Sequence, residues 1–78
     1  MSYPEKYNEI VNKYNNYADN INSRYDEIKS SIENKEITEE YTLEDQQREL
    51  SENETNRRNE LDENETAKQN ELAEYDDE

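Results

Sequence analysis

Apolar residues recur along this chain at a spacing of eleven positions. In successive blocks of eleven residues, the tenth position is occupied by Ile10, Ile21, Ile32 and Leu43. The sixth position of the last three full blocks is occupied by Leu50, Leu61 and Leu72. Eleven residues make very nearly three turns of an α-helix, so each column forms a stripe along one helix face. The pattern predicts a coiled-coil-like helical protein that is straight or slightly right-handed in its supercoil.

The first part of the chain carries the denser apolar seam, because tyrosines stand between the isoleucines at steps of three and four. Tyrosine buries a large ring while its hydroxyl keeps a hydrogen bond, which is typical of a docking face. After residue 43 the seam holds about one leucine in three turns, too few to hold a helix alone. The predicted partner-binding seam comprises Tyr3, Tyr7, Ile10, Tyr14, Tyr17, Ile21, Tyr25, Ile28, Ile32, Leu43, Leu50, Leu61 and Leu72.

Two signals predict where helices begin. Ser2 and Glu5 have the spacing of a capping box, and Pro4 stands in the first turn, where its missing N–H costs nothing. Thr42 and Asp45 have the same capping-box spacing. We therefore expect one helix to begin near residue 3, and a second start is available at residue 42.

The middle of the chain leaves two alternatives open. Glycine is absent and no proline follows the first turn, which favours one continuous helix. The step from Ile32 to Ile37 breaks the rhythm of threes and fours, which favours a bend. The sequence thus predicts an all-α protein, either a long extended helix or a helix–bend–helix. Its predicted segments are a Tyr/Ile seam helix at 1–33, a bend at 34–41 and an acidic helical arm at 42–78.

Composition argues against a compact globule. Of 78 residues, 27% are hydrophobic and 41% are charged. So little apolar surface in so short a chain hardly offsets the entropy of a compact fold. A largely disordered chain that folds only on a partner therefore stays an open alternative.

The net charge of −14 is concentrated in the second half. Residues 1–39 hold eight acidic and five basic side chains, whereas residues 40–78 hold fifteen acidic and four basic ones. This distribution disfavours direct binding to nucleic acid or an anionic membrane and favours a partner with a basic surface. The candidate acidic face comprises Glu49, Glu52, Glu54, Glu60, Asp62, Glu63, Glu65, Glu71 and Glu74.

The residue types needed for most enzymatic chemistry are absent. Without histidine and cysteine, the commonest general base, nucleophile and transition-metal ligands are missing, and without glycine no phosphate-binding loop forms. Carboxylates are numerous, but the calcium-binding loop with its turn glycine is missing. We expect no enzymatic activity, no cofactor and no bound metal, and we interpret the acidic residues as a solvated helix face.

The expected setting is the cytoplasm or a virion. No apolar run reaches the roughly 20 residues of a membrane span. No cationic segment followed by an apolar one opens the chain, so we expect no secretory signal.

Two functions of different classes fit these features. The first is a non-catalytic structural or assembly protein that binds other chains through the seam, as a homo-oligomer or on a larger scaffold. Phage-type virions use short helical proteins of this kind as stalks, plugs or assembly chaperones. The alternative is an acidic inhibitor whose carboxylates imitate DNA phosphates and occupy the basic groove of a nucleic-acid-binding protein. Seam-driven assembly survives salt, whereas a DNA mimic loses its target as salt rises.

Overall fold

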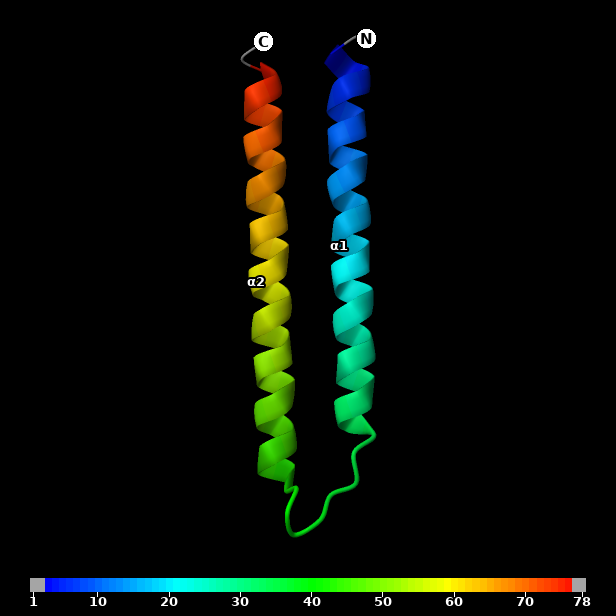
Figure 1. Ribbon diagram of the computed structural model, residues 1–78, viewed down its shortest axis with the longest axis vertical. Coiled ribbons are helices and arrows are strands. Elements are labelled where there is room, and N and C mark those ends of the chain that lie inside the picture. Colours follow the sequence, from blue (N-terminus) through cyan, green and yellow to red (C-terminus); the bar gives the residue numbers. More distant parts are fainter. Residues whose placement is uncertain (1–2, 77–78) are drawn as a thin grey trace.

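Two helices of similar length lie side by side and run in opposite directions (Figure 1). The computed structural model describes residues 3–76, with side chains from 5 to 75; helix α1 spans Tyr3–Glu33 and helix α2 spans Leu43–Asp76. The Cα atoms span 61 × 16 × 10 Å. The predicted all-α, extended, coiled-coil-like fold is confirmed. Of the two alternatives, the chain adopts the helix–bend–helix.

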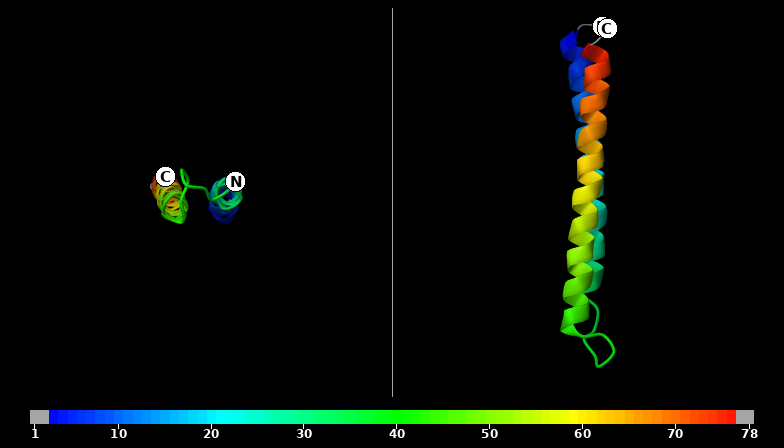
Figure 2. Two further views of the ribbon diagram at one scale, coloured as in Figure 1. Left: turned by 90° about the horizontal axis from the view of Figure 1, so that it is seen from below. Right: turned by 90° about the vertical axis from the view of Figure 1, so that its left-hand side faces the viewer.

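The hairpin is one helix pair with no third layer. Seen end-on, α1 and α2 stand next to each other, and no other described segment covers their outer faces (Figure 2). Seen from the side, both helices are nearly straight, as the eleven-residue period predicts (Figure 2). Helix α1 is already formed at Tyr3, the first described residue, and the predicted capping residue Ser2 lies outside the described range. Both long sides of the pair are therefore available to other chains.

Helix α1 ends in a tightened turn, after which Thr38 organises the bend. The N–H of Lys35 donates to the carbonyl of Ile32 at 3.2 Å, which closes the last turn of the helix. The hydroxyl oxygen of Thr38 accepts hydrogen bonds from the N–H groups of Glu40 and Tyr41, at 3.2 and 3.0 Å. The N–H of Thr38 donates to the Tyr41 carbonyl at 2.8 Å. The bend is therefore an ordered reversal rather than a loose linker.

Thr42 and Asp45 cap helix α2, as their spacing predicts. The N–H of Asp45 donates to Thr42 Oγ1 at 3.2 Å, and the N–H of Thr42 donates to Asp45 Oδ2 at 3.1 Å. These bonds give hydrogen-bond partners to two backbone N–H groups that have none within the first turn of a helix. Glu44 and Asp45 also place negative charge at the positive end of the helix dipole. The cap fixes where α2 begins, and thus which residues meet across the hairpin.

The core is a single column of isoleucines on α1. Ile10, Ile21 and Ile32 are 3, 8 and 7% exposed, and no polar side chain between residues 5 and 75 is equally buried. Burying each isoleucine stabilises the hairpin by about 1.5–3 kcal/mol. On α2 the leucine column 50, 61 and 72 is only half-buried. So small a core leaves the register of the helices to their polar contacts.

Candidate interaction surfaces

Three ion pairs cross the hairpin at intervals of eleven residues. They are Lys13–Glu71, Arg24–Glu60 and Lys35–Glu49, with N···O distances of 2.8, 3.0 and 2.9 Å. Each step of eleven residues forward from Lys13 to Arg24 and Lys35 matches a step of eleven backward on α2, where eleven residues span about 16.5 Å. Lys35 lies two residues beyond the end of α1. We call these pairs the first, second and third rung. They show that the sequence repeat is also a repeat of contacts.

Each rung includes a tyrosine beside the cation. The ammonium of Lys13 lies 5.0 Å from the Tyr14 ring centroid, and the guanidinium of Arg24 lies 5.7 Å from that of Tyr25. The Tyr14 hydroxyl also donates to Glu71 Oε1 at 3.1 Å. Cation, ring and carboxylate thus form one cluster, in which the ring attracts the cation through its π face.

In the third rung the tyrosine comes from the bend. The repeat places Glu36, not tyrosine, after Lys35. Tyr41 fills the same role, since its ring centroid lies 5.0 Å from the Lys35 ammonium and its hydroxyl donates to Glu49 Oε1 at 2.5 Å. The bend therefore completes the repeat where the helix sequence departs from it.

Polar side chains of α2 bind the backbone of α1 in the seam. Asn64 and Asn53 donate through Nδ2 to the carbonyls of Tyr14 and Tyr25, both at 3.1 Å. Gln46 Nε2 donates to the carbonyl of Ile32 at 3.2 Å. Such bonds require a short side chain held close to the facing helix, so they favour one register over its neighbours. They explain why the seam of α2 tolerates amides where leucines would be expected.

Hydrogen bonds shift the titration of the rung carboxylates. The ammonium of Lys13 holds the pKa of the Glu71 carboxyl below its ordinary value. The hydroxyl of Tyr41, followed by the ammonium of Lys35, lowers the pKa of the Glu49 carboxyl. Both carboxylates are therefore charged at neutral pH and hold their partners.

The pKa values of the rung tyrosines are shifted in the opposite direction, upwards. Partial burial, followed by the interaction with a carboxylate, raises the pKa of Tyr14 and Tyr25. The same two causes raise the pKa of Tyr41 to about 12. Ionising any of these hydroxyls would remove a hydrogen-bond donor and place a second negative charge beside the carboxylate. The tyrosines thus act as neutral donors throughout the physiological range.

The nine carboxylates of the predicted acidic face separate into three groups. Three lie in the rungs and face α1: Glu49, Glu60 and Glu71. Two pair with bases of α2 itself: Glu54 with Arg57 and Arg58, and Glu65 with Lys68. Four are exposed on α2: Glu52, Asp62, Glu63 and Glu74. The face is therefore interrupted by cations of both helices.

The predicted seam also divides. Ile10, Ile21 and Ile32 are buried, and Tyr14, Tyr25, Leu50, Leu61 and Leu72 are half-buried. Tyr7, Tyr17, Ile28 and Leu43 are exposed, and Tyr3 lies outside the residues whose side chains are described. Most of the described seam is thus occupied within the chain, by the pairing of α1 with α2. Only its exposed members remain for a partner.

Tyr17 and Ile28 stand on the side of the hairpin that carries the rungs. They are 49 and 45% exposed and eleven residues apart, on one face of α1. The Tyr17 ring meets the Tyr14 ring edge-on, with 5.4 Å between centroids. Ile28 lines a groove of about 500 Å³ together with Lys35 and Glu49. Both side chains therefore flank the ion pairs.

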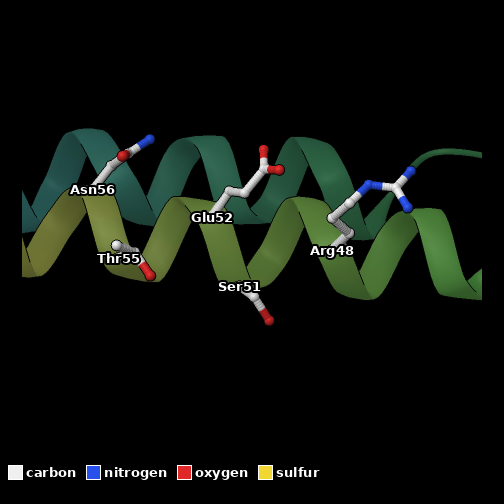
Figure 3. A pocket seen from close by; sticks show the side chains of 5 residues that line it. All are labelled: Arg48, Ser51, Glu52, Thr55 and Asn56. Carbon is white, nitrogen blue, oxygen red and sulfur yellow. The ribbon is translucent and has the colours of Figure 1, made fainter.

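A depression of about 370 Å³ on α2 is lined by residues of that helix alone, and its side chains diverge (Figure 3). These are Arg48, Ser51, Glu52, Thr55 and Asn56. Over the described residues, no group of three carboxylates is placed to hold a metal ion. Within the same part of the chain, no helix is long and apolar enough to cross a membrane.

Sequence reasoning missed the residues that set the register. The cations Lys13, Arg24 and Lys35 occupy one column of the eleven-residue frame, the second position of each block. Asn53 and Asn64 occupy equivalent positions of a repeated phrase. A search of all eleven columns for opposite charges, and not only for apolar residues, would have found both signals. Tyr41 stands outside its column, so the repeat gives no sign of it.

Comparisons with protein-family models, with curated proteins and with solved structures found no significant match for this chain.

Proposed function

We propose that this chain is a non-catalytic structural or assembly protein, part of a virion or another scaffold, which binds other chains through apolar side chains that its hairpin leaves uncovered. One observation carries the proposal: between residues 5 and 75, five large apolar side chains are exposed and only three are buried. Scattered exposed apolar residues are ordinary on a large protein, but here they outnumber the core. A rod with this balance gains stability by covering them.

The exposed apolar residues fall into separate places. Tyr17 and Ile28 flank the rungs, and Tyr7 lies towards the start of α1. Ile37 and Leu43, 42 and 63% exposed, lie together at the closed end of the hairpin. A rod that offers apolar contacts on its side and at its tip is suited to linking other chains.

The DNA-mimic alternative has weaker support. Mimicry requires a regular row of free carboxylates, about one charge per 1.7 Å of axis. Glu49, Glu60 and Glu71 form the most regular acidic row, and each is paired with a cation: Glu60 and Glu71 with cations of α1, and Glu49 with Lys35 just after α1. The row is therefore largely neutralised within the chain.

Recovery of bound proteins tests the proposal. We would recover partners of the tagged full-length chain at low and at about 0.5 M salt, where charges are screened within a few ångströms. The variant Tyr17→Asn/Ile28→Asn is compared with Asp62→Asn/Glu74→Gln, which removes two exposed charges. A structural protein keeps its partners in salt and loses them in the apolar variant. Partners that vanish in salt and in the charge variant would instead support the mimic.

A further inference from the structure

We infer that the ladder face binds a second copy of this chain, so that two hairpins form a four-helix assembly. The ladder face is the side of the hairpin that carries the three rungs together with Tyr17 and Ile28. The inference deepens the proposed function, on which it rests, because it names the surface and the partner.

The first support is the position of the two exposed side chains. Tyr17 and Ile28 are eleven residues apart, so they stand about 16.5 Å from each other along one line of α1. Each lies one turn from a rung cation, Lys13 or Arg24. A two-fold axis between them places Tyr17 of each copy against Ile28 of the other, as an isologous interface requires. One surface thus supplies both halves of the contact.

The second support is electrostatic. The rungs contain three cations and three anions, so the net charge of −14 is carried by the rest of the chain. Two copies that met through the outer face of α2, which carries the exposed carboxylates, would bring strongly acidic surfaces together, which is costly. On the ladder face, α2 contributes Glu52 and Asn56 to the groove beside Ile28. Of the charged side chains that line this groove, Lys35 and Glu49 pair with each other, which leaves only Glu52 without an opposite charge in the lining. A basic partner, by contrast, would be drawn to the acidic sides.

The third support is the area that the hairpin leaves exposed. Its accessible surface is 5961 Å². A compact monomer of 9.5 kDa would expose about 5,050 Å². The excess of about 900 Å² is close to the roughly 800 Å² that each partner buries in a standard interface. Docking one long side on a second copy would thus reduce the accessible surface of each hairpin to about that of a compact protein of this mass.

Sedimentation equilibrium of the full chain tests the inference. We expect twice the monomer mass of 9.5 kDa, with tighter association at about 0.5 M salt, because salt screens the repulsion between two acidic chains. Tyr17→Asn/Ile28→Asn should raise the dimer dissociation constant by about tenfold or more. The matched control is Ile37→Asn/Leu43→Asn, which alters two exposed apolar residues at the tip and should leave the dissociation constant unchanged. Circular dichroism checks that each variant keeps its helices.

The outcomes separate this inference from the proposed function. A folded wild-type chain that stays monomeric at high concentration and high salt would overturn the second-copy interface. An unchanged dimer dissociation constant in the Tyr17/Ile28 variant would overturn it as well. If the monomer nevertheless recovers other proteins in a Tyr17- and Ile28-dependent way, the proposed function stands with a foreign partner. A dimer that recovers nothing further supports self-association alone.

Discussion

Helices α1 and α2 have similar lengths, 31 and 34 residues, but they contribute to the hairpin in different ways. The buried side chains, Ile10, Ile21 and Ile32, all come from α1. The amides that cross the seam come from α2, and they bind carbonyls of α1. One helix thus supplies apolar burial, which is strong but indifferent to register. The other supplies hydrogen bonds, which are individually weak but specific in position.

This division explains how a strongly charged chain can form a defined hairpin. Because the sequence repeats every eleven residues, the two helices could also pair after sliding by one repeat. In that arrangement the isoleucine column would again face the leucine column. The cap of Thr42 and the contact of Tyr41 with Glu49 occur only at the bend. These two contacts therefore select one register of the helices, which the repeat alone would not select.

Removing burial from α1 should have the largest effect. Ile21 is 8% exposed and is the middle member of the isoleucine column that forms the core. Ile21→Ala should lower the free energy of unfolding by about 2–4 kcal/mol, measured by urea unfolding under circular dichroism. In a chain with so small a core, that loss should leave much of the population unfolded.

The control for this change is Ile28→Ala on the same helix. Ile28 is 45% exposed, so in the isolated hairpin its truncation should cost less than about 1 kcal/mol. The protein concentration in this measurement must be low enough that the inferred dimer is dissociated. Equal losses in the two variants would contradict the assignment of the core to a single column of isoleucines.

Removing a polar contact from α2 should have a moderate effect. Asn53→Ala deletes the bond to the Tyr25 carbonyl and should lower the free energy of unfolding by about 1 kcal/mol. Asn59→Ala, six residues further on an exposed part of α2, should be neutral or slightly stabilising, since alanine is the better helix former. If both variants were equally stabilised, the seam amides would be filling space rather than setting the register.

The elements that could be predicted from the sequence are those with a local cause. The start of α1, the cap at Thr42 and the isoleucine column follow from spacing rules that act within a few turns of one helix. Whether the chain would continue through residues 34–41 or turn back was left open, because neither glycine nor proline marks the bend. The reversal depends on Thr38 and on contacts between distant segments, which composition does not reveal.

The candidate site was harder to predict than the fold. The seam residues were identified, but α2 of the same chain covers most of those described, because Leu50, Leu61 and Leu72 fall opposite the isoleucine column once the chain reverses. The sequence predicts one solvated acidic face because ion pairs between the two helices depend on the register of the hairpin. Partners such as Arg24 and Glu60 are 36 positions apart, and only the register of the hairpin brings them together.

The smallest expected effect concerns Tyr41, and it appears as a change in pH dependence. The pKa of Tyr41 is raised to about 12 from an ordinary value of 10.0, first by partial burial and then by its bond to Glu49. A group whose pKa is higher in the folded state stabilises that state fully below the unfolded pKa. Its contribution is lost as pH rises from about 10 to about 12. Wild-type stability should therefore decline over this range, and Tyr41→Phe should decline less steeply.

Urea unfolding at several pH values from about 9 to about 12 measures how the free energy of unfolding changes with pH in the wild type and in Tyr41→Phe. Tyrosinate absorbance follows the ionisation of the tyrosines directly. All other ionisable side chains are the same in both proteins, so the difference between the two curves reports on Tyr41. In the absorbance titration, the step of highest pKa should disappear from Tyr41→Phe. Parallel stability curves would mean that the bend tyrosine touches Glu49 without holding the third rung. In that case the register would depend on the cap of Thr42 and the seam amides alone.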